Sequence, residues 1–92
     1  MNVFSRQAAI TVGDLDAQDY ASDCIAAIRT DLVKSTFHAY VQAGYVVNGD
    51  FFKGKHASMR VVELDFAAAT AALDYSDLSA IHAMIETKEA AA

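Results

Sequence analysis

The fold of this chain is decided by one stretch, Tyr45-Val46-Val47-Asn48-Gly49-Asp50-Phe51-Phe52. Its centre, Asn48-Gly49, stands between two largely apolar segments and is a strong short-range signal for a β-hairpin. A type I′ turn needs positive φ at both central residues, and Asn followed by Gly adopts that conformation at low cost. The stretch therefore predicts two antiparallel strands, the second of which ends at Lys53 and Gly54.

Downstream of the hairpin, residues 61–66 alternate between apolar and polar side chains. This period-two pattern is typical of a half-buried strand, with an apolar side made by Val62, Leu64 and Phe66. A helix is the competing interpretation, because segment 59–73 also has apolar residues at helical spacing: Met59, Val62, Phe66, Ala69 and Leu73. We favour the strand, since a helix would leave Val61 and Leu64 exposed.

The C-terminal part of the chain is alanine-rich and then periodic. Segment 67–73 forms a short helix, either separate or joined to the next one across Asp74-Tyr75. Ser76 or Asp77 is a suitable N-cap for a last helix. The apolar stripe of that helix consists of Leu78, Ile81 and Ile85, with Met84 at its edge.

Upstream of the hairpin, segment 14–43 has apolar side chains at a four-residue spacing, which indicates a long amphipathic helix. Acidic residues at its start suit the helix macrodipole, and Gly44 supplies a C-terminal stop. A break into two helices is expected near Thr30-Asp31. Before this segment, residues 8–12 form a short strand, or Ser5 caps a first helical turn. The stripe consists of Tyr20, Cys24, Ile25, Ile28, Leu32, Val33, Phe37 and Val41.

A chain of 92 residues suits one compact domain with a radius of gyration of about 12 Å. We therefore expect a single domain over residues 1–92. Its expected fold class is α+β, with helices packed on a short antiparallel sheet that contains the Asn48-Gly49 hairpin. The alternative is an all-α helical bundle.

The composition limits the classes of function. Seven basic and 12 acidic side chains give a net charge of −5, which argues against a duplex-DNA binder because such proteins need a broad cationic face. The single cysteine, Cys24, excludes an intramolecular disulfide and suits the reducing cytoplasm. We find no secretory signal and no apolar run near the roughly 20 residues of a membrane span. We therefore expect a cytoplasmic protein with no membrane partner.

No pattern for catalysis, a cofactor or a metal stands out. No two histidines flank a glutamate at the spacing of a zinc-binding helix, and Cys24 has no second cysteine to join it. Cys24 also falls on the apolar stripe, where a thiol is normally inert. The Gly-x-Ser-x-Gly motif of a nucleophile elbow is missing as well. We expect no enzymatic activity, no cofactor and no metal.

A basic segment follows the hairpin and contrasts with the acidic rest of the chain. It contains Lys53, Lys55, His56 and Arg60, and the aromatic pair Phe51-Phe52 precedes it. Cations beside an aromatic platform are typical of a contact with phosphate or single-stranded nucleic acid. The simpler interpretation is a solvated loop whose charges balance nearby acids. The segment lacks the further glycines and the Lys-Ser/Thr pair of a phosphate-binding loop.

A second candidate surface is acidic. On the expected helix, Asp16, Asp19 and Asp23 share one face, where their carboxylates could imitate phosphates and occupy a partner's basic groove. The simpler interpretation is that these acids cap a helix and keep an alanine-rich chain in solution. A calcium loop is excluded, because its central glycine and terminal glutamate are missing.

These observations predict a small acidic, non-enzymatic binding protein that blocks a partner's surface. Small inhibitors encoded by phages and mobile elements, such as anti-CRISPR-like proteins, have this general profile. The expected partner is a protein, with nucleic-acid-handling complexes among the candidates. The alternatives are a phosphate or single-stranded nucleic-acid contact module and a regulatory subunit that self-associates through its alanine-rich helices. The expected partner-binding residues are Asp16, Asp19, Asp23, Phe51, Phe52, Lys53, Lys55, His56 and Arg60.

Overall fold

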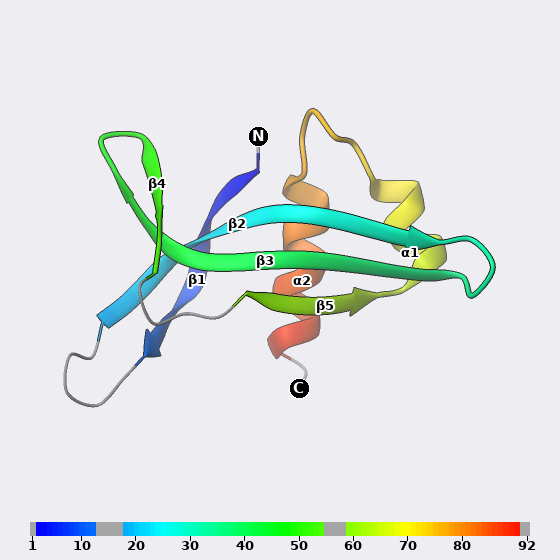
Figure 1. The fold of residues 1–92 in the computed structure, drawn as a ribbon, viewed down its shortest axis with the longest axis horizontal. Helices are drawn as coiled ribbons and strands as arrows, with labels where there is room; N and C mark the ends of the chain where they lie inside the picture. Colours follow the sequence, from blue (N-terminus) through cyan, green and yellow to red (C-terminus); the bar gives the residue numbers. More distant parts are fainter. Residues whose placement is uncertain (1, 13–17, 55–58, 91–92) are drawn as a thin grey trace.

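The computed structural model describes residues 2–12, 18–54 and 59–90 of the chain. This part forms five antiparallel strands followed by two helices (Figure 1). The helices are α1 (Phe66–Ala72) and α2 (Ser79–Ala90). The strands are β1 (Val3–Val12), β2 (Gln18–Asp31), β3 (Thr36–Val47), β4 (Asp50–Lys53) and β5 (Arg60–Leu64).

Strand β3 organises the sheet because it is long enough to hold two partners along one edge. The strand order is β1-β2-β3-β4, and β5 also pairs with β3. Residues 44–47 of β3 pair with β4, whereas residues 37–41 pair with β5. The chain therefore leaves the hairpin, returns to the same edge of β3 and passes directly into α1.

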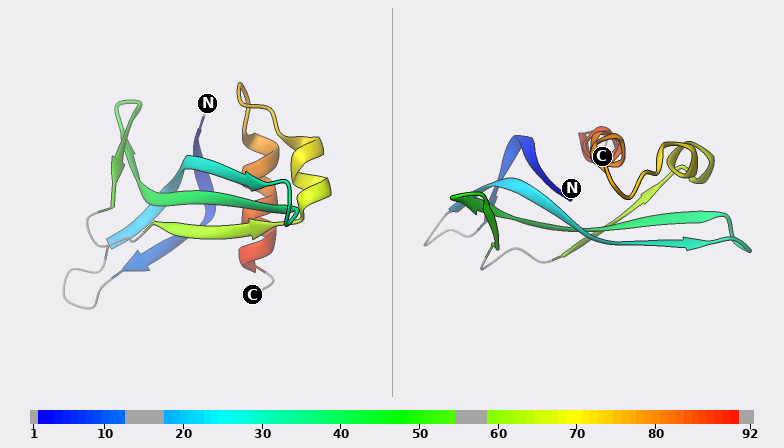
Figure 2. Two further views of the ribbon diagram at one scale, coloured as in Figure 1. Left: turned by 45° about the vertical axis from the view of Figure 1, so that its right-hand side comes forward. Right: turned by 90° about the horizontal axis from the view of Figure 1, so that it is seen from above.

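In the part of the chain that the structure describes, both helices lie on one face of the sheet (Figure 2). Alternate residues of β3 point toward them, and Phe37, Ala39 and Val41 are fully buried there. None of the described helices is long and apolar enough to cross a membrane. The core between sheet and helices contains Phe4, Ile25, Phe37, Ala39, Val41, Val62, Leu64, Ala69, Leu78, Ile81 and Ile85.

The predicted β-hairpin is confirmed. Asn48 and Gly49 have φ angles of 51° and 84°, as a type I′ turn requires, and β4 ends at Lys53. Gly44 has a different role from the helix stop that we expected. A Cβ atom at Gly44 would collide with the carbonyl oxygen of Phe52, so glycine is what allows β4 to approach the base of the hairpin.

The predictions downstream of the hairpin are also confirmed. The alternating segment forms β5, and the alanine-rich segment is a separate helix, α1, whose first turn is capped by Asp65 through a 3.0 Å hydrogen bond from the backbone N–H of Ala68. The carboxylate of Asp77 accepts a 3.1 Å hydrogen bond from the backbone N–H of Ser79 at the start of α2. The fold is therefore α+β, and the alternative of an all-α bundle is wrong.

The prediction of a long helix over residues 14–43 is wrong. From Gln18 onward this segment forms β2, a tight turn and β3. The spacing misled because four is an even number, so that Phe37 and Val41 share one face of β3 just as they would share one face of a helix. An irregularity between Ile25 and Ala27 puts Cys24 and Ile28 on opposite faces of β2. The strand expected at residues 8–12 belongs to β1, which already begins at Val3.

The expected break at Thr30-Asp31 marks the turn between β2 and β3. The Asp31 carboxylate accepts hydrogen bonds of 2.9 and 3.0 Å from the backbone N–H groups of Val33 and Lys34. This turn carries Leu32 and Val33 out of the core, where they are 80% and 95% exposed. The radius of gyration of 13.6 Å exceeds the expected value because two hairpins extend beyond the layer of helices.

Candidate functional site

A fully buried carboxylate, that of Asp23, lies at the centre of the interface between the sheet and α2. Asp23 pairs with Phe4 across β1 and β2, so its side chain faces the helices. Its Oδ2 atom lies 2.6 Å from Nη1 of Arg6 and 3.0 Å from Nε2 of His82. Its Oδ1 atom lies 3.3 Å from Nη2 of Arg60. Three cationic or titratable groups from β1, β5 and α2 thus converge on one carboxylate.

Two glutamates of α2 extend this arrangement. Glu89 lies 2.8 Å from Nε of Arg60 and 3.7 Å from Nη1 of Arg6, and Glu86 lies 3.2 Å from Nδ1 of His82. Both ring nitrogens of His82 therefore contact a carboxylate. We call Arg6, Asp23, Arg60, His82, Glu86 and Glu89 the ion-pair cluster.

The ion-pair cluster shifts the titration of its buried members. Burial alone would raise the pKa of Asp23, but hydrogen bonds from His82 and Arg6 and the charges of Arg60 and Arg6 hold it below the ordinary 3.8. Burial alone would lower the pKa of Arg60, yet its contacts with Glu89 and Asp23 raise it. Asp23 and Arg60 are therefore both charged at neutral pH.

The cluster makes stability depend on acid. Because the folded-state pKa of Asp23 is lowered, its stabilising contribution is complete above about pH 5 and is lost as the pH falls through that lowered pKa. We expect the free energy of unfolding, measured with urea at a series of pH values, to decrease steeply below about pH 4. Asp74 and Asp77 add to this trend, because hydrogen bonds with Ser76 and Ser79 lower their pKa values.

A variant separates the contribution of Asp23 from those of the other acids. Asp23→Asn removes the buried titrating group and keeps Asp74 and Asp77, so its acid dependence should be shallower than that of the wild type. Equal slopes for the two proteins would contradict the assignment of acid sensitivity to the cluster.

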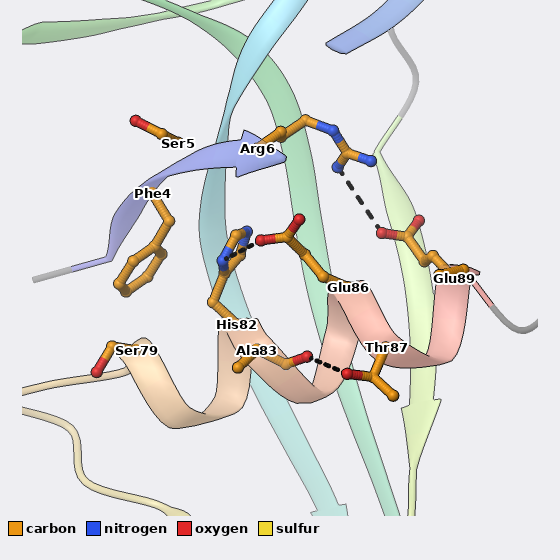
Figure 3. A pocket seen from close by; sticks show the side chains of 10 residues that line it. Phe4, Ser5, Arg6, Ser79, His82, Ala83, Glu86, Thr87 and Glu89 are labelled. Atoms are coloured by element: carbon orange, nitrogen blue, oxygen red, sulfur yellow. Dashed lines mark hydrogen bonds and ion pairs between the residues drawn. The ribbon is translucent and has the colours of Figure 1, made fainter. Parts of the chain in front are cut away.

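A pocket of about 700 Å³ opens between β1 and α2 beside the ion-pair cluster (Figure 3). Its wall contains Arg6, His82, Glu86 and Glu89, and the Phe4 ring stacks on the His82 ring with centroids 4.8 Å apart. In this wall both ring nitrogens of His82 contact carboxylates, Nε2 that of Asp23 and Nδ1 that of Glu86. The described residues contain no group of His, Cys, Asp and Glu side chains suited to a metal ion. The ion pairs of His82 and Glu89 with residues of the strands hold α2 on the sheet.

The β3–β4 hairpin lies at one end of the molecule (Figure 1) and carries exposed apolar side chains on both of its faces. Tyr45 and Phe52 are paired across the two strands, and their rings stack with centroids 5.7 Å apart. Four apolar side chains of this hairpin are substantially exposed: Tyr45 at 37%, Val46 at 44%, Val47 at 47% and Phe52 at 46%. We call Tyr45, Val46, Val47, Phe51 and Phe52 the aromatic arm. Large apolar side chains gathered on a short hairpin are typical of a docking surface.

The expected acidic surface differs from what the structure describes. Asp23 is fully buried in ion pairs, and the helix that would align it with Asp16 and Asp19 does not form. Asp19 lies in β2 opposite Thr11, with its side chain outside the described part, and Asp16 lies outside the described residues altogether.

The expected basic and aromatic residues are divided between interior and surface. Arg60 points inward to Asp23 and Glu89. It lies two positions before the buried Val62 on β5, and residues two apart share one face of a strand. Phe52 and Lys53 are exposed on β4, and Phe51 is partly buried. Lys55 and His56 lie outside the described residues. Asp23 of the expected acidic surface and Arg60 of the expected basic surface thus form an ion pair with each other.

Sequence reasoning missed the partners of Asp23, above all those on α2. A signal for them is present: His82 adjoins the Ile81/Ile85 stripe, and Glu86 and Glu89 follow it at the i+4 and i+7 positions. Polar side chains that continue the buried side of a helix indicate buried partners, because an unpaired charge there is costly.

Burial also raises the pKa of the Cys24 thiol, which disfavours the nucleophilic thiolate. Cys24 receives a 3.4 Å hydrogen bond from the Asn2 side chain.

No protein-family model, curated protein or solved structure gives a significant match to this chain. A function for this protein is therefore inferred from its own residues.

Proposed function

We propose that this protein is a small acidic, non-enzymatic binding protein that docks its aromatic arm into an apolar cleft of a partner protein and thereby blocks that surface. The observation that carries the proposal is the exposure of Tyr45, Val46, Val47 and Phe52, between 37% and 47% each, on one hairpin. Exposed aromatic residues beside aliphatic ones are the side chains that dominate binding energy when a partner covers them.

The rigidity of the aromatic arm supports the proposal. The type I′ turn at Asn48-Gly49, the close approach of β4 at Gly44 and the Tyr45–Phe52 stack hold the arm in one conformation. A surface that is ordered before binding loses little conformational entropy in the complex, so more of the contact energy contributes to affinity.

The charge of the chain supports a partner with a basic rim around its cleft. A net charge of −5 accelerates association with a cationic surface and disfavours other acidic proteins. Proteins that handle nucleic acids have such surfaces, which is why we propose an inhibitor of the phage or mobile-element type, anti-CRISPR-like in its mode of action. A single free cysteine fits action in the cytoplasm.

The test is affinity capture of the partner by matched variants. Wild type, Phe52→Ser, Tyr45→Ser and Tyr75→Ser are immobilised in equal amounts and exposed to lysate, and captured proteins are quantified by mass spectrometry. Tyr75 is 71% exposed and lies outside the arm, so Tyr75→Ser is the control for removing an exposed aromatic ring. A partner bound through the arm should lose at least about tenfold in affinity with Phe52→Ser or Tyr45→Ser and keep its affinity with Tyr75→Ser.

Capture of the same protein by all four forms would contradict docking through the arm.

The salt dependence of oligonucleotide binding tests the alternative of a phosphate or single-stranded nucleic-acid contact through Lys53, Lys55 and His56. Binding of a single-stranded oligonucleotide that weakens steeply with salt would favour that alternative, from which Arg60 is withdrawn by its ion pairs with Asp23 and Glu89.

A further inference from the structure

The face of the sheet opposite the helices carries two ordered rows of side chains across β2, β3 and β5. Residues directly opposite in an antiparallel sheet share a face, so the register defines both rows. One row is Arg29, His38 and Glu63, and the other is Ala27, Tyr40 and Val61. We call these six residues the open face. Val61 is 55% exposed, and Arg29, Ala27 and Glu63 are exposed as well.

The charged row has opposite signs at its two ends. Arg29 stands on β2, Glu63 stands on β5, and His38 lies between them on β3 with its Nε2 atom 3.4 Å from Oε1 of Glu63. A two-fold axis that runs along β3 in the plane between two facing sheets exchanges the β2 side with the β5 side. Such an axis places Arg29 of each copy opposite Glu63 of the other.

The apolar row is complementary under the same symmetry. The axis places Ala27 of one copy, a small side chain, opposite Val61 of the other, and it brings the two Tyr40 rings together on the axis. Sheets that pack face to face keep their strands within about 30° of alignment at a separation of about 10 Å, which agrees with an axis along β3. An interface between identical copies must be self-complementary in this manner.

We propose that a second copy of this chain covers the open face and forms a two-fold homodimer with Arg29–Glu63 ion pairs on both sides of a central Tyr40 contact. The charge order and the size order of the two rows both point to a copy of the chain as the occupant. The six residues of the open face are distinct from the aromatic arm, which lies further along β3, so the two proposals rest on different residues.

The test is sedimentation velocity over a wide concentration range with charge-reversed variants. Wild type should dimerise with increasing concentration. Arg29→Glu places two acidic side chains opposite each other on both sides, and Glu63→Arg does the same with two basic ones. Each of these variants alone should dimerise at least about 100-fold more weakly than wild type, since like charges facing each other in an interface cost several kcal/mol.

Two further measurements make the test specific for this arrangement. An equal mixture of Arg29→Glu and Glu63→Arg should form a heterodimer, because each residue 29 then faces a residue 63 of opposite sign, and the double variant should dimerise like wild type. Lys34→Glu is the control, since it makes the same kind of charge change in the turn after β2, outside the open face.

A wild type that remained monomeric at every concentration would overturn the proposal, because the open face would then be a solvated sheet surface. Dimerisation of both single variants at wild-type strength, or a mixture that fails to associate, would also overturn it. Circular dichroism of each variant establishes that it is folded. None of these variants changes the aromatic arm, so the outcome is separate from the capture experiment.

Discussion

Asp23→Asn should lower the free energy of unfolding by about 3–5 kcal/mol, because it leaves the largely buried guanidinium of Arg6 without its nearest counter-charge and the buried His82 ring without one of its partners. The side chains of Arg6 and His82 are only 10% and 6% exposed, so water cannot replace the lost carboxylate. Glu89 still pairs with Arg60 and Glu86 with His82, which places the expected loss toward the lower end of the range. Urea unfolding at neutral pH measures the difference from wild type.

Asp50→Asn is the matched control for this measurement. Asp50 is exposed at the start of β4, and the same chemical change there should alter the free energy of unfolding by less than about 0.5 kcal/mol. If Asp23→Asn were as mild as Asp50→Asn, the ion-pair cluster would contribute no net stability. The role assigned to it in holding α2 on the sheet would then be wrong.

Phe37→Ala should also cost about 3–5 kcal/mol of unfolding free energy, because it removes a fully buried ring from the core. Phe37 lies on β3 opposite Leu64 of β5 and belongs to the cluster that also contains Ala69 of α1. The loss therefore combines the transfer of the ring to water with the cavity left between the sheet and the helices. Urea unfolding or a thermal scan measures it.

Val33→Ala serves as the control for Phe37→Ala and tests the fold at the same time. In a helix these two residues, four positions apart, would share one buried stripe and both would be costly to truncate. In the structure Val33 is 95% exposed at the turn between β2 and β3, so its truncation should change stability by less than about 0.5 kcal/mol. A large loss for both variants would favour the helix and contradict the strands.

The contrast between two segments explains how much of the fold could be predicted. The Asn48-Gly49 hairpin was predictable because its signal is local: two adjacent residues with the required φ angles define the turn. The apolar stripe of Ile81 and Ile85 in α2, with Leu78 just before it, was predictable for the same reason, since a helix is made by contacts three and four residues apart.

Segment 18–43 shows where such reasoning fails. The spacing of Tyr20 and Cys24 is compatible with a strand as well as with a helix, and an irregularity between Ile25 and Ala27 disturbs the alternation that would have indicated β2. A clearer signal was present in β3, where Phe37, Ala39 and Val41 alternate with His38 and Tyr40. The β-branched and aromatic residues near Val46 also favour a strand.

The candidate site was accessible from sequence only in part. Phe52 was expected on a surface and is exposed on the aromatic arm, although its binding role stays a prediction. Asp23 and Arg60 were assigned to two different surfaces, yet their side chains lie 3.3 Å apart in one buried cluster. Neither residue has a neighbour in sequence that reveals this pairing, because the two positions are brought together by β2, β3 and β5.

By itself the sequence determined the hairpin and the last helix, since both follow from interactions within a few residues. It favoured the α+β class over an all-α bundle, although the long helix that it placed over residues 14–43 is not there. Only the tertiary structure decided that residues 18–43 belong to two strands joined by a turn and that Asp23 is the centre of an ion-pair cluster. The partners of Asp23 lie 17, 37 and 59 positions away in the chain. Strand pairing and buried ion pairs depend on such distant partners, so local propensity and spacing do not specify them.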